Sequence, residues 1–323
     1  MDRRNFVGAV LGGFLAAPTD GLAQQQARTP PRIGFLNSES AANESQRLEA
    51  FRGGLRELGY VEGKDIVVEV RFADGHYERL PTLAAELVDL QVRAIVASGR
   101  KSTVVAMRAT AMIPIVMQTG DALAHGIVSN LARPGGNITG WTYVAHQLTA
   151  KRLELLRECV PHMSRVAYLT DADEESAIVA LRSAAEKFNI SFQHFAVRDR
   201  SGLDNIFAAV IGSRCDAVVV QAGDFFQVGA KAVADLAIAH RLPSVGMVGF
   251  ARAGGLVGYG PDLLEGHRRL ALYVDKILKG ARPGDLPVEQ ASKFDLEINA
   301  NTARAIGVAV PESVLLRATT VFG

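Results

Sequence analysis

The sequence predicts an α/β protein built from two doubly wound parallel-sheet lobes. Short apolar segments alternate with longer segments whose apolar residues recur at helical spacing, and this alternation runs twice along the chain. The segments expected to be strands are apolar throughout, which is typical of parallel strands covered by helices on both faces. The duplication indicates two lobes of similar construction.

The first half of the pattern begins after a polar lead-in. A strand is expected at residues 32–36, followed by a helix whose apolar residues share one face until Gly59 ends it. A further helix is expected to start near Lys101. The remaining elements expected in this half are strands at 65–70, 93–97 and 113–117 and a helix over 80–90.

The second half repeats this order. Ala94-Ile95-Val96 corresponds to Ala217-Val218-Val219, and Ile113-Pro114-Ile115 corresponds to Leu242-Pro243-Ser244. The expected strands are 165–169, 191–195, 216–220 and 242–245, and the expected helices are 177–188, 203–211 and 228–240.

Turn-forming residues indicate where the chain passes between the lobes. Pro134-Gly135-Gly136-Asn137 precedes a strand at 138–142 that is expected to cross, and a second crossing is expected at 256–260. An amphipathic helix over 263–277 follows. The expected divisions are a signal peptide at 1–23, a first lobe of 32–141 plus about 260–285, a second lobe of 142–259, and a segment 286–323 with a hinge strand and short helices that is assigned to neither lobe.

The first 23 residues carry the features of a secretory signal peptide. Arg3 and Arg4 precede an apolar run at 6–17, and small residues follow at 21–23. The run is shorter than the ~20 apolar residues of a membrane-spanning helix. The arginine pair also fits a twin-arginine signal, although an ordinary basic start has the same appearance. We therefore expect a periplasmic protein.

The charge balance excludes several classes of partner. The chain has 35 Lys and Arg against 34 Asp and Glu, a net charge of +1 that removal of 1–23 leaves unchanged. This favours neither nucleic acid nor an anionic membrane surface as a partner.

No later apolar stretch is long enough to insert into a membrane, and we expect a monomer. Cys159 and Cys215 could pair in an oxidising compartment, but two unpaired thiols are expected.

Motif searches favour binding over catalysis. The sequence contains no GxGxxG after the first strand, no GxSxG and no HExxH, and its histidines lack metal-ligand spacing. Residues 99–102 (GRKS) resemble the end of a phosphate loop, but position 94 is alanine where that loop needs glycine. Asp171 and Asp173 suit either acid–base work or a solvated helix start. No cofactor and no metal are expected.

Ligands of parallel sheets bind beyond the carboxyl ends of the strands, which selects the candidate site residues. We expect hydroxyl and N–H donors at Ser98, Gly99, Thr119 and Gly120 to hold a ligand carboxylate. A carboxylate at Asp121 or Asp224 would pair with an ammonium group, and an aromatic ring at Trp141, Tyr143, Phe225 or Phe226 would stack on the ligand. The other strand-end candidates are Asn37, Ser38, Gln118, Asp171, Gln221 and Met247.

Each of these roles has a structural alternative. Ser98-Gly99 also fits a plain turn from strand to helix, and Asp121 also fits a cap on the following turn. Trp141 sits where packing at the hinge would explain it equally well, and Phe225 and Phe226 suit a core.

Seven motifs stand in order along the chain, at residues 50–63 (AFRGGLRELGYVEG), 80–88 (LPTLAAELV), 129–140 (SNLARPGGNITG), 151–156 (KRLELL), 254–260 (GGLVGYG), 273–280 (YVDKILKG) and 286–290 (LPVEQ). They resemble those of the ABC-transporter substrate-binding proteins of the tryptophan/tyrosine-uptake-like family, which are periplasmic binding proteins of type I. The resemblance covers about residues 32–320.

The resemblance implies two Rossmann-like lobes joined by a three-crossing hinge, closing on a small molecule. It also implies delivery to an ABC permease with a cytoplasmic ATPase, and ligands such as aromatic amino acids or related small acids. The chain departs from the family pattern at the expected contacts. Ser98-Gly99-Arg100 replaces Gly-Thr-Pro, Asp121-Ala122-Leu123 replaces Asp-Pro-Val, and 170–173 (TDAD) replaces a loop containing Asn-Pro.

We therefore expect an exported solute-binding receptor for a small organic molecule that bears a carboxylate, and we expect no enzymatic activity. An exported sensor that reports to a receptor kinase has the same sequence features, and neighbouring permease and ATPase genes would favour transport. An enzyme on the same architecture is a third possibility, because a fold does not determine function.

Overall fold

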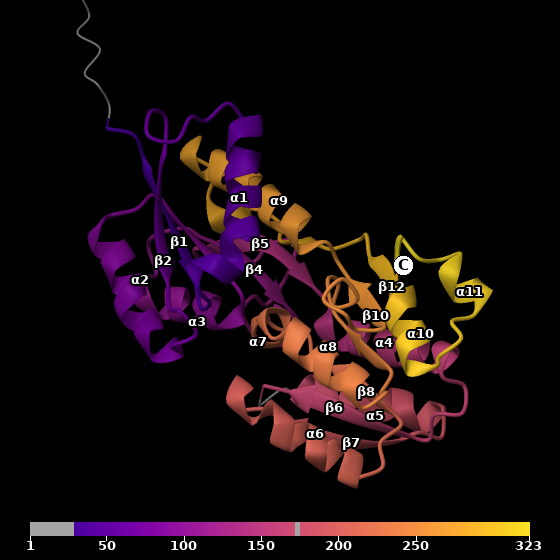
Figure 1. The fold of residues 1–323 in the computed structure, drawn as a ribbon. Helices are drawn as coiled ribbons and strands as arrows, with labels where there is room; N and C mark the ends of the chain where they lie inside the picture. Colours follow the sequence, from indigo (N-terminus) through magenta and orange to yellow (C-terminus); the bar gives the residue numbers. More distant parts are fainter. Residues whose placement is uncertain (1–28, 172–174) are drawn as a thin grey trace, which may run out of the picture.

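The computed structural model describes residues 29–171 and 175–323, and it confirms the predicted fold class. Two α/β lobes lie next to each other, each built around one sheet (Figure 1). The expected signal peptide at 1–23 and Asp173 lie outside the described residues.

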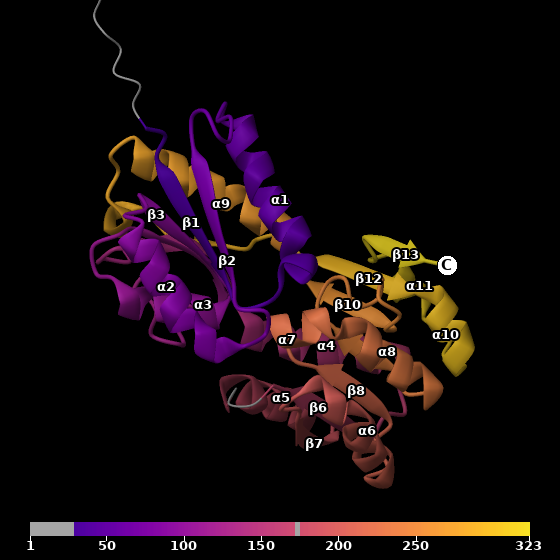
Figure 2. The ribbon, with the colours of Figure 1, turned by 60° about the vertical axis from the view of Figure 1, so that its left-hand side comes forward.

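The first sheet is entirely parallel over its described strands. They are β1 (Arg32–Asn37), β2 (Val67–Phe72), β3 (Ala94–Ser98), β4 (Ile115–Gly120), β5 (Ile138–Tyr143) and β11 (Glu289–Gln290), which lie in the order β11-β5-β4-β3-β1-β2. Helices cover both faces, with separate apolar cores beneath them. They are α1 (Ala41–Glu57) and α9 (Leu263–Leu278) on one face and α2 (Leu80–Asp89) and α3 (Arg100–Ala109) on the other (Figure 2).

The second sheet differs in one respect from an all-parallel sheet. Its strands are β6 (Arg165–Thr170), β7 (Ser191–Ala196), β8 (Ala217–Val220), β9 (Ser244–Gly246), β10 (Val257–Gly260), β12 (Asp295–Asn299) and β13 (Thr320–Phe322), in the order β13-β12-β10-β9-β8-β6-β7. The β10–β12 pair is antiparallel, because β12 enters this sheet from the first lobe after its last crossing.

Helices also cover both faces of the second sheet. One apolar core lies under α4 (Ala145–Cys159), α5 (Glu175–Lys187), α10 (Ala300–Ile306) and α11 (Glu312–Leu315), and the other lies under α6 (Leu203–Gly212), α7 (Asp224–Val228) and α8 (Ala230–Ala239). The helix expected at 228–240 is shorter than predicted, because Gly229 ends α7 and precedes α8. Cys159 and Cys215 are buried and unpaired.

Within the described residues the chain crosses between the lobes three times, after β5, after β10 and between β11 and β12. The segment 286–323 therefore divides between the lobes, with β11 in the first sheet and the rest on the second. β5 runs to Tyr143 in the first sheet, two residues past the expected boundary. None of the described helices is both long and apolar enough to span a membrane.

A close approach of two helices closes one face of the first lobe. α1 and α9 lie side by side in both ribbon views (Figures 1 and 2). A Cβ atom added at Gly54 of α1 would lie 2.4 Å from the backbone oxygen of Arg268 in α9 and 2.8 Å from Cβ of Ala271. Only glycine fits this contact. A Cβ atom added at the neighbouring Gly53 would meet no atom closer than 3.7 Å.

This pair of glycines gives a matched test of the α1–α9 contact. Gly54→Ala forces the helices apart and should lower the free energy of unfolding by about 1–3 kcal/mol. Gly53→Ala adds a methyl group in open space and should leave stability unchanged or raise it by up to ~1 kcal/mol through helix propensity. Urea unfolding of the two variants measures the difference; equal effects would show that the close approach is unimportant.

Candidate functional site

A cavity of about 70 Å³ lies between the lobes at the carboxyl ends of their strands. From the first lobe it is lined by residues that directly follow β1 and β3 and by the end of β4. From the second lobe it is lined by residues after β6 and β8 and by the start of α7. Parallel strands end at one edge of their sheet, and here the two edges face each other.

Most of the sequence-predicted site residues line this cavity. Tyr143 and Phe225 place aromatic rings in its wall, and Asp171 and Gln221 meet there, since the backbone N–H of Asp171 donates to Oε1 of Gln221 at 2.7 Å. The predicted residues in the lining are Ser38, Gly99, Gln118, Thr119, Gly120, Asp121, Tyr143, Asp171, Gln221 and Phe225.

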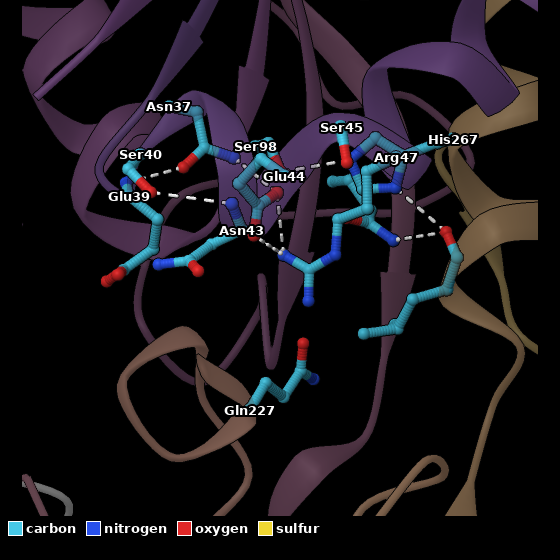
Figure 3. Close-up of polar contacts among 12 residues, drawn as sticks. Asn37, Glu39, Ser40, Asn43, Glu44, Ser45, Arg47, Ser98, Gln227 and His267 are labelled. Atoms are coloured by element: carbon cyan, nitrogen blue, oxygen red, sulfur yellow. Dashed lines mark hydrogen bonds and ion pairs between the residues drawn. The ribbon is translucent and has the colours of Figure 1, made fainter. Parts of the chain in front are cut away.

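Ser98 is not in the cavity lining, which corrects the expectation that its hydroxyl faces the ligand. Ser98 is fully buried, and its Oγ lies 2.9 Å from Nε2 of His267 on α9 (Figure 3). Nδ1 of the same ring lies 2.8 Å from the carbonyl of Leu263, which can only accept, so Nδ1 carries the proton and Nε2 accepts from Ser98. The Ser98 hydroxyl therefore joins β3 to α9.

Asn37 is likewise used inside the first lobe. Its Nδ2 donates to Oε2 of Glu44 at 2.7 Å, and its Oδ1 accepts from the backbone N–H of Glu39. Glu44 in turn pairs with Arg47 at 2.9 Å (Figure 3). This buried network fixes the first turn of α1 against the end of β1 and leaves the adjacent Ser38 at the cavity.

Three other predicted residues, Trp141, Phe226 and Met247, are not in the cavity lining. Trp141 is buried against α9, where an added Cβ at Gly266 would meet its ring at 3.1 Å, so the packing alternative applies. Met247 accepts from Nε2 of Gln227 through its Sδ and lines a groove of about 590 Å³ on the other flank of Gln221. Asp224 is the first residue of α7, and its side chain lies outside the described part.

Asp121 lines the cavity, but its carboxylate already has a partner. It accepts from the backbone N–H of His146 at 3.0 Å, and its other oxygen lies 2.8 Å from Nδ1 of the same residue. Because His146 is in the first turn of α4, Asp121 caps that helix from the neighbouring lobe. An ammonium group of the ligand would compete with this arrangement.

Several lining residues were not predicted as site residues, and two of them, Arg100 and Lys101, are cationic. Arg100 and Lys101 begin α3, directly after Gly99, and His125 lies near them. The Lys101 Nζ lies 3.6 Å from Oδ2 of Asp171 and 3.4 Å from the ring centroid of Tyr77. The Lys101–Asp171 pair joins the two lobes across the cavity. The sequence predicted a helix start near Lys101 and an N–H donor at Gly99, but not that the side chains of this helix reach the second lobe.

The electrostatics of the cavity favour a negatively charged group. The first turn of α3 places backbone N–H groups and a positive helix end beside Arg100 and Lys101. Burial, followed by the charge of Arg100, lowers the pKa of His125. In the part of the chain that is described, no cluster of three His, Cys, Asp or Glu side chains could hold a metal ion.

Comparisons with known proteins show the family of this chain. The model of the family described as ABC transporter substrate binding protein matches residues 39–322. A tyrosine-binding protein of Clostridioides difficile strain R20291 is 24% identical over 265 residues, which span 80% of this chain and 75% of that protein.

Solved structures show the same fold. A Streptococcus pneumoniae ABC domain in complex with L-Trp superposes with a TM-score of 0.83 at 23% identity, covering 91% of this chain and 100% of that one. A conserved domain protein of Vibrio cholerae also gives 0.83, at 22% identity and the same coverage. A ligand-free, open substrate-binding protein of Clostridium difficile gives 0.67 at 20% identity, covering 90% of this chain and 99% of that one.

The Lys101–Asp171 pair should favour the closed arrangement of the lobes. Lys101→Met removes a partly exposed ion pair worth about 0.2–1 kcal/mol, so the ratio of closed to open ligand-free protein should fall about 1.4- to 5-fold. Energy transfer between dyes on the two lobes measures this ratio. Lys151→Met, which breaks a pair with Glu154 inside α4, is the control and should change nothing; equal ratios in both variants would contradict the role of Lys101.

His267 should make stability depend on pH. Burial, together with the charge of Arg47, lowers its pKa from 6.5 to about 3, so the folded protein holds the neutral ring while the unfolded chain takes up a proton below about pH 6.5. Its contribution is fully present above pH 6.5 and is lost as pH falls towards 3. Between pH 7 and pH 5 this loss is about 2 kcal/mol.

Chemical denaturation at the two pH values tests this dependence. His267→Gln should lose stability at both values and should lose the added sensitivity to acid. His162→Gln alters an exposed histidine and should keep the acid sensitivity of the parent protein. If the His267 variant keeps it as well, the buried ring is not its source.

Proposed function

Because the chain belongs to the ABC transporter substrate binding protein family, we propose that it captures a small organic molecule between its lobes and delivers it to a membrane permease with a cytoplasmic ATPase. The observation that carries this proposal is the cavity, since both lobes line it at the carboxyl ends of their strands. A ligand held there contacts both lobes at once and stabilises their closed arrangement.

The ligand in this proposal bears a carboxylate. Arg100 and Lys101, at the positive end of α3, attract an anion into the space between the lobes. Tyr143 and Phe225 offer aromatic faces for an apolar or aromatic portion of the ligand. The relatives named for tyrosine and for L-Trp support an aromatic amino acid as the first candidate.

The ammonium group of such a ligand needs an acidic partner. The carboxylate of Asp121 is occupied by His146, and that of Asp171 is engaged by Lys101. We therefore assign this role to Asp224, which precedes the cavity-lining Phe225 at the start of α7.

Binding requires the lobes to open. A buried water needs about 10–15 Å³ of such space, so a cavity of about 70 Å³ holds roughly five to seven waters. An aromatic amino acid is larger than this. In the proposal the ligand enters an open form through hinge motion at the three crossings, and the lobes then close around it.

The remaining parts of the proposal concern the cell. A signal peptide at 1–23 directs export to the periplasm, by the general or the twin-arginine route, and the mature chain acts as a monomer. The family binds substrates rather than converting them, and we propose that this chain likewise releases its ligand unchanged.

A thermal-shift screen of residues 24–323 tests the proposed ligand class. The panel holds amino acids, aromatic and branched acids, sugars and nucleosides. A ligand at 100 times its dissociation constant adds about 2.7 kcal/mol to the free energy of unfolding and should raise Tm by roughly 5–10 °C.

The outcomes separate the parts of the proposal. Hits among aromatic or other amino acids support it, and Asp224→Asn should then weaken binding of the amino acid more than binding of the matching acid without an ammonium group. Hits confined to sugars or nucleosides would leave a binding protein and contradict the carboxylate ligand.

A further inference from the structure

One cation in the described part of the chain is buried without a full set of partners. Arg152 of α4 is fully buried, and its Nε donates to the carbonyl of Tyr259 in β10 at 2.8 Å. Its Nη1 and Nη2 are buried without a hydrogen-bond partner. These two nitrogens form the edge of the guanidinium that binds carboxylates through two parallel hydrogen bonds.

Such an arrangement is costly unless an anion joins it. A buried charge without a partner carries a large desolvation penalty, and a paired anion offsets it. Burial lowers the pKa of Arg152 to about 10, so the side chain still carries its charge at neutral pH. The structure therefore contains a buried cation whose two terminal nitrogens are available to an anion.

Arg152 lies on the helix whose first residue, Ala145, lines the cavity. Ala145, which lines the cavity, and Arg152 are seven residues apart on α4, so they lie on one face of the helix. Tyr143 is close enough to Arg152 to raise its pKa slightly against the lowering by burial, and it also lines the cavity.

Arg152 also lies at the hinge. A Cβ added at Gly260, the last residue of β10 before the chain crosses to α9, would lie 3.4 Å from Nη2 of Arg152 and 3.6 Å from the backbone nitrogen of Val248. Motion of the lobes about this crossing changes the surroundings of the guanidinium. An anion that reaches Arg152 is therefore held where the two lobes pivot.

We propose that Arg152 is the residue that recognises the carboxylate of the ligand, through Nη1 and Nη2, with Tyr143 separating it from the cavity until the ligand binds. This deepens the proposed function and rests on it. It replaces the role expected of Ser98, whose hydroxyl is paired with His267. It also makes closure depend on the ligand, because without an anion the closed form carries an unpaired buried charge.

The first test uses acetate as the smallest carboxylate and acetamide as its neutral counterpart, at constant ionic strength. Acetate at ten times its dissociation constant should raise the Tm of the unmodified protein by about 3–6 °C, and acetamide should not. Arg152→Met should abolish the acetate shift. Arg157→Met, which alters an exposed arginine of α4 stacked on Phe188, is the control and should keep it.

Arg152→Lys keeps the charge but loses the two-pronged geometry, so it should keep a weaker acetate response. This variant serves if Arg152→Met fails to fold. An acetate shift that is absent from the unmodified protein, or unchanged in the Arg152 variants, would overturn the proposal.

The second test uses L-tyrosine and tyramine, which differ by the carboxylate. Arg152→Met should weaken L-tyrosine binding about 30-fold or more and remove the preference over tyramine. An acetate shift that depends on Arg152 together with unchanged L-tyrosine binding would show that the site takes a free anion instead, which also overturns the proposal. If L-tyrosine fails to bind the unmodified protein, the ligand named under the proposed function is wrong, and the acetate test still decides the role of Arg152.

Discussion

In β1 and β3 of the first sheet, the position of a residue at the strand end decides whether its side chain reaches the space between the lobes. Asn37 at the end of β1 aligns with Ser98 at the end of β3, and Ser98 aligns with Gln118 of β4. The last strand residues, Asn37 and Ser98, are covered by α1 and α9 and hydrogen-bond there. The residues that directly follow them, Ser38 and Gly99, line the cavity. In these two strands, a shift of one residue along the chain therefore separates side chains bonded inside the lobe from side chains that line the cavity.

This register explains how far the sequence could be interpreted. Apolar strands alternating with helices predicted two lobes and the loops of the cleft, because both depend on local pattern and on the geometry of parallel sheets. The sequence did not allow the hydrogen-bond partners of individual side chains to be predicted. Ser98 and His267 are 169 positions apart and meet only because α9 returns to the first lobe, and the pairing of Asp121 with His146 depends on a crossing.

Two charged features sit where the lobes meet, and they act in opposite directions. The Lys101–Asp171 pair joins the lobes and favours the closed arrangement. In the proposal made above, the unpaired guanidinium of Arg152, buried beside the hinge, disfavours that arrangement unless an anion joins it. On that proposal the ligand shifts the balance between the open and the closed arrangement, which suits a protein that must both capture a molecule and release it.

Closure around a ligand is the central claim, and small-angle X-ray scattering of residues 24–323 tests it most directly. The radius of gyration should fall when the ligand identified in the thermal-shift screen is added at saturation. This fall should follow the same concentration dependence as binding. A saturating ligand that leaves the radius of gyration unchanged would contradict the account, because a molecule held between the lobes cannot bind both of them without drawing them together.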